Sequence, residues 1–576
     1  MIATTGIKTV ALATTNQMDT GIRAVSAVLK SKYRIIKLKL YEDGRHGPST
    51  NYSEKEIQSI ARKLRELNVD LLGISLFGYG AERGFTLLQA VKRELGIPII
   101  IGGQYAMQWP DECLAKGADA VCLSESERGL VELLDNWDIR LERDNPNFVV
   151  KEDDLLRRFK LQAGLPPAEE INEITPDFND EDYYVLASEQ MAPVIAEEMA
   201  NPRHHQTDRD LRTYIYASDR GCPFNCTFCH VLDIRVLVSL ARAEQDGDHV
   251  NLLRRKSPGA MVRDMRAIKK LNPWVEHLTL MNDDTAARPV AEMQEFSRLY
   301  RQDIAWPFYC MVSPMSLWNT RNGVSEGRMK IQALVDAGLT ELNAGIQTNG
   351  KSNKKYYNRV QPDEALFAVT DMLHEFAEGG IGLFYDFITF NPLESPEETR
   401  QTYELIKRLK PPFDLVSHTL HIDRRTAMRK QYEQYKSEAI AAGTPYNKVH
   451  EDLVGESDYH DTPRFYDWLA DNPKFFLDAT MEFLAGRHDL EMTGRIPRFA
   501  QDLLEFDVFK ELKLRHSALV QMLEGVNIPK DMMSLDLLIS EQMERFFRQN
   551  PAVFKELYLN LNDRHPIHYS NMRKTW

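Results

Sequence analysis

Cysteine is scarce in this sequence, with 6 residues among 576. So low a content excludes a fold that is stabilised mainly by disulfide bonds, and it is typical of proteins from a reducing compartment. We therefore expect a cytoplasmic protein. In such a protein, a local group of cysteines indicates metal binding or redox chemistry rather than cross-linking.

Long hydrophobic runs and an excess of basic charge are also absent. The sequence contains no run of about 18 or more apolar residues, so we expect no membrane span. It has 71 Lys and Arg against 85 Asp and Glu, which gives a net charge of −14 with His neutral. Because nucleic-acid binding needs a basic surface that neutralises phosphates, we expect no nucleic-acid partner. Apolar residues make up 43% of the chain, enough for a large core.

Residues 1–140 alternate short apolar strands with amphipathic helical patterns. The clearest helix spans 54–68, where Ser53 and Glu56 have the spacing of a capping box. This alternation predicts a parallel sheet covered on both faces. Five such units predict a flavodoxin-like doubly wound domain whose ligands lie beyond the carboxyl ends of the strands. The predicted strands are Thr9–Ala13, Ile35–Leu40, Leu71–Leu76, Ile99–Ile101 and Ala120–Leu123.

The rest of the chain divides into three parts. Residues 141–210 are acidic, punctuated by proline and weakly periodic, so we interpret them as a linker. Residues 211–428 alternate strands and helices again and predict a (βα)6 partial TIM-type barrel with active residues at the carboxyl ends of its strands. Residues 429–576 are predicted to form a mainly helical C-terminal region that includes an amphipathic helix over 535–547. The predicted barrel strands are Thr213–Ser218, Leu278–Met281, Phe308–Val312, Leu342–Ile346, Leu383–Phe390 and Leu415–Leu420.

A cysteine motif directly after the first barrel strand is the strongest functional signal. Cys222, Cys226 and Cys229 are separated by three and two residues. Thiolates hold iron–sulfur clusters, and three of them leave one iron of a [4Fe–4S] cluster open to bind and activate a small molecule. The alternative is a structural zinc site that adds His230. Adjacent Cys229 and His230 would hardly share one tetrahedron, and zinc ligands usually form two separated pairs.

This motif, with Arg220 and Gly221 before it and an aromatic residue before the last cysteine, resembles that of the radical S-adenosylmethionine (SAM) superfamily. The resemblance implies that the three cysteines hold a [4Fe–4S] cluster whose open iron chelates the amine and carboxylate of SAM. It also implies that Phe228 packs near the adenine. An electron from a donor such as flavodoxin or ferredoxin would then cleave SAM to a 5′-deoxyadenosyl radical.

Two further strand ends fit this resemblance. Asp283 and Asp284 follow the second barrel strand, where the family has polar residues that receive the SAM amine; a solvated turn or a helix cap is the alternative. Gln347 and Thr348 follow the fourth strand, where relatives often have a Glu-Ser pair near the SAM ribose. The segment 387–392 lacks the glycine that is usual in the family.

The N-terminal part is similar to the cobalamin-binding domain that precedes many radical SAM barrels. Gly102, Gly103 and Gln104 follow the fourth strand, and the run Ser-Glu-Ser-Glu at 124–127 follows the fifth. By this resemblance those three residues and Ser75 would line the nucleotide tail or the corrin. The alternative for paired glycines is a tight turn. The loop 15–21 contains no His, so it supplies no imidazole to cobalt.

These features together resemble a class B radical SAM methyltransferase. They imply a cobalamin-dependent enzyme that methylates an unactivated carbon of a small-molecule intermediate, with both cofactors facing one cavity between Gly102 and Cys222. The alternatives are a radical SAM cyclase or rearrangement enzyme, with or without cobalamin, and more remotely a zinc-stabilised binding module. No residue is identified as catalytic. Tyr459, His460 and Tyr466 are candidate proton or hydrogen donors, or ordinary packing residues.

Overall fold

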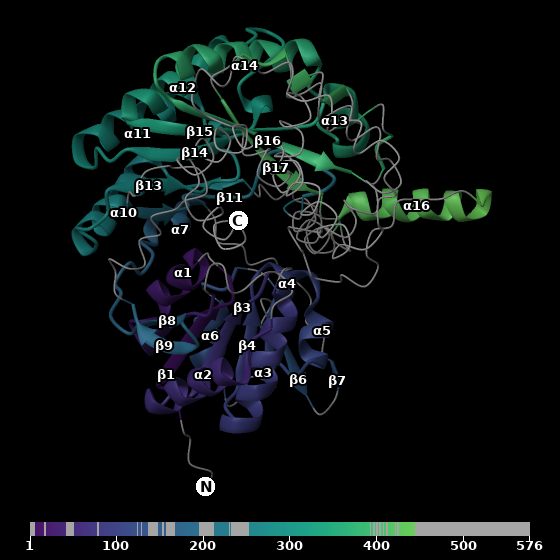
Figure 1. The fold of residues 1–576 in the computed structure, drawn as a ribbon. Coiled ribbons are helices and arrows are strands. Elements are labelled where there is room, and N and C mark those ends of the chain that lie inside the picture. Colours follow the sequence, from purple (N-terminus) through teal and green to yellow (C-terminus); the bar gives the residue numbers. More distant parts are fainter. Residues whose placement is uncertain are drawn as a thin grey trace, which may run out of the picture.

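The computed structural model describes two α/β units between residues 6 and 443 (Figure 1). The longer gaps in this description are 42–50, 138–147, 157–167, 195–211 and 232–252, and shorter ones lie at 17–18, 78–79, 124, 128, 136, 153–154 and 230 and at several positions between 392 and 425. The predicted helix over 535–547 and the residues Tyr459, His460 and Tyr466 lie outside the described residues, as does His230. No helix within the described ranges is long and apolar enough to cross a membrane.

The first unit is built on a parallel sheet that contains all five predicted strands. They are β1 (Thr9–Thr14), β2 (Arg34–Lys39), β3 (Leu71–Ser75), β4 (Ile99–Gly102) and β5 (Ala120–Cys122). Their spatial order is β5-β4-β3-β1-β2, and the pairs between them are parallel. This is the strand order of flavodoxin-like sheets.

Helices cover both faces of this sheet. Along β1, Val10 and Leu12 belong to one apolar cluster, while Ala11 and Ala13 belong to another. Since alternate residues of a strand point to opposite faces, the sheet is packed on both sides. The helices are α1 (Thr20–Leu29), α2 (Glu54–Glu66), α3 (Ala81–Leu95), α4 (Gln104–Gln108), α5 (Pro110–Ala115) and α6 (Gly129–Asp135). The predicted capping box is confirmed, with Ser53 and Glu56 bonded to each other's backbone N–H.

The segment 141–210, predicted as a linker, contributes further strands to the edges of this sheet. β6 (Phe148–Glu152) is antiparallel to β5 and continues into β7 (Leu155–Leu156), whereas β8 (Tyr183–Ala187) is parallel to β2 and is followed by β9 (Gln190–Pro193). These edge strands have only two to five residues, too few for a clear alternation of apolar and polar residues. A short helix, α7 (Ala168–Glu173), precedes β8.

The second unit is a parallel sheet in chain order, and it confirms the six strands predicted for this region. They are β10 (Thr213–Tyr216), β13 (His277–Leu280), β14 (Phe308–Val312), β15 (Leu339–Gln347), β16 (Gly382–Phe390) and β17 (Asp414–Thr419). A core that includes Met265, Phe296, Leu334 and Leu366 joins the outer helices to the sheet (Figure 1). Those helices are α10 (Pro258–Leu271), α11 (Val290–Asp303), α12 (Ser325–Ala337) and α14 (Asp363–Glu378).

Further elements follow the carboxyl ends of these strands. A two-stranded ribbon pairs β11 (Asp219–Arg220) with β12 (Arg254–Arg255) just before the cysteine motif. Two 3-10 turns, η2 (Thr285–Ala287) and η3 (Pro314–Ser316), follow β13 and β14. Helix α13 (Gly350–Tyr357) follows β15, and α16 (Ala427–Ala442) follows β17. The sheet therefore presents its loops and the cysteine motif at the same edge.

Candidate active site

A cavity of about 440 Å³ lies where the carboxyl ends of the two sheets face each other. The first sheet contributes the ends of β3, β4 and β5, and the second contributes the end of β10 and the β11 ribbon. Ligands of open α/β sheets bind at such carboxyl edges. Lining residues from the first unit include Ser75, Gly102, Gly103 and Gln104, and those from the second include Ser218, Arg220, Gly221 and Asp283.

The cysteine motif forms a compact loop beside this cavity. The N–H of Cys229 donates to the carbonyl of Cys226 at 3.1 Å, so the last two cysteines belong to one turn. Burial raises the pKa of the Cys222 thiol to about 12, and the negative charges of Asp284 and Asp283 act in the same direction. Cys222 therefore lies close to the end of β13, where the family resemblance places a SAM contact.

The three cysteines do not converge on a single point. Within the described ranges, no group of three His, Cys, Asp or Glu side chains has the geometry to hold one metal ion. A zinc ion needs its ligands around one centre, whereas a [4Fe–4S] cluster attaches each thiolate to a different iron. Three thiolates on one short loop are the donor set of a [4Fe–4S] cluster that keeps one iron open.

Two backbone hydrogen bonds and one side-chain hydrogen bond of Thr227 hold the cysteine loop. Its N–H donates to the carbonyl of Tyr357 at 3.1 Å, its hydroxyl donates to the carbonyl of Tyr356, and its carbonyl accepts from the N–H of Met428 at 3.0 Å. Phe228 packs edge-on against Tyr357, with ring centroids 5.1 Å apart. The loop is therefore fixed by α13 on one side and by the start of α16 on the other.

Asp283 and Asp284 have different surroundings. Asp284 is buried and accepts from the N–H groups of Ala286 at 3.1 Å and Ser313 at 3.0 Å, as well as from the hydroxyl of Ser316. Asp284 therefore caps η2, and a cap is the alternative role that the sequence offered for this pair. Burial raises the pKa of Asp284 to about 6. Asp283 is exposed at the cavity, so it is the better placed of the two to meet a ligand.

Gln347 and Thr348 also differ. Thr348 is fully buried, and its hydroxyl shares hydrogen bonds with Thr402 at 2.6 Å and Glu394 at 3.3 Å, so it serves the packing of the loops. Gln347 is only partly buried and ends β15 with a positive φ of 72°, which is uncommon for a residue with a side chain. The chain turns there, and the pairing between β15 and β16 shifts in register at the same place.

The two glycines at the end of β4 differ in whether a side chain would fit. Gly103 has φ +90°, and a Cβ there would lie 2.5 Å from the carbonyl oxygen of Leu76. A Cβ on Gly102 would meet nothing closer than 3.7 Å. The tight-turn requirement therefore applies to Gly103, while both glycines, Ser75 and Gln104 line the cavity.

An ion-pair cluster connects the first unit to the cysteine motif. Glu125 binds Arg254 through both oxygens, at 2.5 and 2.7 Å, and also pairs with Arg220, which pairs with Glu127 at 2.5 Å. Burial opposes ionisation of Glu125, but the charges and hydrogen bonds of the two arginines lower its pKa below the usual value. Sequence reasoning missed Arg254. Its position in the basic run Arg254–Lys256 is the only local signal.

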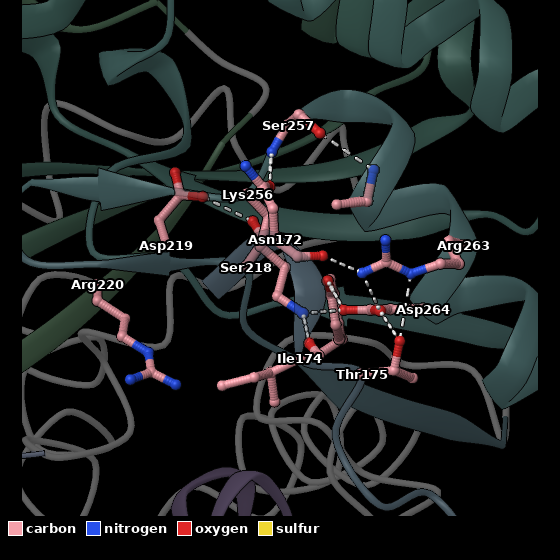
Figure 2. A network of polar contacts seen from close by, with 12 residues as sticks. Asn172, Ile174, Thr175, Ser218, Asp219, Arg220, Lys256, Ser257, Arg263 and Asp264 are labelled. Carbon is pink, nitrogen blue, oxygen red and sulfur yellow. Dashed lines mark hydrogen bonds and ion pairs between the residues drawn. The ribbon is translucent and has the colours of Figure 1, made fainter. Parts of the chain in front are cut away.

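A second polar network fixes the residues that lead into the second unit (Figure 2). Lys256 donates to the carbonyl of Ile174 at 2.6 Å and to Asp264, which is fully buried. Asp264 also accepts from the hydroxyls of Thr175 at 3.0 Å and Tyr216 at 2.9 Å. The network therefore ties the segment before β8 to β10 and α10. It surrounds Lys256, which also lines the cavity.

Comparisons with known proteins agree with this geometry. The bacteriochlorophyllide d C-8(2)-methyltransferase of Chlorobaculum tepidum is 21% identical over 398 residues, which cover 68% of this chain and 74% of that protein. The cobalamin-dependent SAM radical enzyme OxsB, solved with aqua-cobalamin and SAM, superposes with a TM-score of 0.62 at 12% identity, over 97% of this chain and 81% of that one. The radical SAM methyltransferase TsrM from Kitasatospora setae has a TM-score of 0.50 at 11% identity, over 74% of this chain and 78% of that one.

At these identities, the structural likeness shows the fold alone. The family match is more specific, because residues 218–406 match the radical SAM superfamily. This span contains the cysteine motif and the strand ends around it, and the family uses a [4Fe–4S] cluster and SAM. The chain therefore carries a radical SAM domain at residues 218–406 and is a radical SAM enzyme.

Proposed function

We propose that this protein is a cobalamin-dependent radical SAM methyltransferase that acts on an unactivated carbon of a small molecule. The observation that carries the proposal is the single cavity lined by both the β11–Gly221 segment, next to Cys222, and the glycine edge of the first sheet. When bound, the cluster and SAM supply a radical that abstracts hydrogen, and cobalamin supplies a methyl group. A reaction that uses the radical and the methyl group on one substrate requires SAM and cobalamin to face the same cavity.

On the barrel side, Cys222, Cys226 and Cys229 would hold the cluster. Asp283 would receive the SAM amine, while the buried Asp284 keeps the loops after β13 and β14 together. Gln347 would face the ribose, next to the buried Thr348, and Phe228 would border the adenine. The exposure of Asp283, the partial exposure of Gln347 and the internal bonding of Asp284 and Thr348 support these roles.

On the side of the first unit, Ser75, Gly102, Gly103 and Gln104 would line the cobalamin. Gly103 lets the backbone turn without a side chain at the cavity, which is the kind of close approach that a bulky cofactor needs. The relatives support this assignment, since OxsB was solved with aqua-cobalamin and TsrM with cobalamin. The cobalamin domain would include the edge strands from 141–210 in addition to residues 1–140.

The proposal also assigns a domain to each part of the chain after residue 210. Residues 211–428 would form the radical SAM core, as a partial barrel, and residues 429–576 a helical C-terminal domain that closes the cavity and sets specificity. Met428 and Tyr432 of the α16 region pack with Phe228 and Tyr357 beside the cysteine loop, which supports a role for this region near the site. The expected compartment is the reducing cytoplasm, with a flavodoxin or ferredoxin as electron donor.

The test is an anaerobic reconstitution followed by incubation with SAM and a reductant. We expect the absorption and EPR signals of a [4Fe–4S] cluster, formation of 5′-deoxyadenosine, and retention of cobalamin after purification from supplemented cells. Production of 5′-deoxyadenosine without any bound cobalamin would favour the cobalamin-free alternative. A preparation that holds zinc in place of iron and sulfide would reject the proposal.

A further inference from the structure

Arg359 places a guanidinium group directly on one of the three cluster cysteines. Its Nη1 lies 3.4 Å from Sγ of Cys226, within hydrogen-bond distance for sulfur. Both side chains are buried, with 6% of Arg359 and 7% of Cys226 exposed. The contact is therefore shielded from water, where a hydrogen bond and a charge act more strongly than at the surface.

The fold fixes this guanidinium at the carboxyl ends of two strands. Its Nη2 donates to the carbonyl of Gly345 at 2.7 Å and to the hydroxyl of Ser313 at 3.3 Å. The N–H of Arg359 donates to the carbonyl of Asn353 at 3.0 Å, just after α13 ends. Contacts to β14, β15 and α13 thus hold the side chain in place before any cofactor binds.

The charge of Arg359 is not balanced by an acidic side chain among the residues that the structure describes. No described carboxylate lies within ion-pair distance of it, and its hydrogen-bond partners are two oxygens and one sulfur. A buried guanidinium without an anionic neighbour is costly. A thiolate of Cys226, bound to a cluster, would supply the negative charge that this position calls for.

We propose that Arg359 tunes the cluster by stabilising its reduced state through Cys226. This inference rests on the [4Fe–4S] cluster of the proposed function. Reduction adds one electron, which comes from the external donor, and no bond at Arg359 forms or breaks. Because hydrogen bonds to cluster sulfurs and nearby positive charge favour the more negative state, Arg359 raises the reduction potential and makes the cluster easier to reduce.

The experiment is an EPR-monitored redox titration of the reconstituted cluster without SAM. We compare the wild-type protein with R359K, which keeps the charge but loses the planar fork, and R359Q, which loses the charge. At a fixed ambient potential, we expect R359Q to lower the ratio of reduced to oxidised cluster about tenfold, or about 59 mV for one electron, with R359K in between. The control is R328Q, because Arg328 is exposed on α12 and pairs with Glu375.

Iron and sulfide content and circular dichroism are measured first for every variant. If R359Q does not retain its cluster, the comparison of R359K with the wild-type protein decides. A potential that is equal in the wild-type, R359K and R359Q proteins overturns the inference. The same holds if the potential stays constant while SAM binding weakens, since the guanidinium would then serve a carboxylate ligand. Absence of a cluster from the wild-type protein would instead reject the proposed function.

Discussion

Replacing Glu125 with glutamine removes the carboxylate that joins the first α/β unit to the β11–β12 ribbon. The change keeps the size of the side chain and takes away its charge, which pairs with both Arg220 and Arg254. The Glu125 side chain is 22% exposed and that of Arg254 is 8% exposed, so the pair is mostly shielded. Arg220 lies two positions before Cys222. Weakening these ion pairs should therefore loosen the cysteine loop as well.

The magnitude follows from the burial. Removing one partner of a buried ion pair costs about 3–5 kcal/mol, and the partial exposure of Glu125 places it at the lower end, about 3 kcal/mol. That energy corresponds to an opening equilibrium about a hundredfold larger. Hydrogen–deuterium exchange of the backbone amides in β11 and β12 measures it, since these amides exchange when the ribbon separates.

Matched variants make the result decisive. Glu127→Gln removes one carboxylate from Arg220 and none from Arg254, so we expect a smaller increase in exchange. Arg328→Gln, at an exposed pair, should leave the ribbon unchanged. If Glu125→Gln exchanges no faster than Arg328→Gln, the ion-pair cluster does not hold the units together and the reasoning is refuted.

The stability that the Glu125 ion pairs contribute should also depend on pH. The arginines lower the pKa of Glu125 below its ordinary value of 4.5 in spite of burial. A carboxylate of this kind contributes stability above that value and loses it as the pH falls through its lower folded-state pKa. The difference in exchange between the wild-type protein and Glu125→Gln should therefore be full at neutral pH and shrink in acid.

Three further predictions concern the glycine turn, the cluster ligands and a buried carboxyl group. Gly103→Ala should lower the midpoint of denaturant unfolding and weaken cobalamin binding measured by absorbance, because its Cβ would collide with backbone, whereas Gly102→Ala should change both little. Cys222→Ala should sharply reduce the iron and sulfide retained after reconstitution, while Cys310→Ala, in the hydrophobic core, should retain both; equal loss in the two variants would contradict the assignment. Burial raises the pKa of Glu394 to about 7, so this group makes the wild-type protein lose stability as the pH rises from about 4.5 to 7, by at most about 3 kcal/mol. Glu394→Gln should flatten that part of the pH profile of unfolding, and a profile parallel to that of the wild-type protein would show that Glu394 does not titrate there.

Local patterns in the sequence predicted much of the architecture. The period of apolar residues indicated the five central strands of the first sheet and the six strands of the second, because a strand or helix repeats its pattern over a few neighbouring residues. The capping box of Ser53 and Glu56 was equally local. So was the cysteine motif, whose three ligands lie within eight consecutive residues and whose spacing alone indicated the cluster chemistry.

Predictions that depended on side-chain surroundings were less complete. Asp283 and Asp284 are neighbours in the sequence. Asp283 lines the cavity, whereas Asp284 accepts hydrogen bonds from the loops after β13 and β14. The edge strands between 141 and 210 were missed for a similar reason. Lys37 in β2 pairs with Asp177 at 2.8 Å, a contact across 140 residues that no local pattern reveals.

The sequence by itself therefore determined the central strands and main helices of the two units and the position of the cysteine loop, since these depend on residues that are close along the chain. Only the tertiary structure decided which strand ends share the cavity, that Glu125 meets Arg254, and that Arg359 reaches Cys226. Glu125 and Arg254, like Cys226 and Arg359, are more than a hundred positions apart. These contacts arise because parallel strands bring their carboxyl ends to one edge, and the packing of the two sheets then sets which side chains meet there.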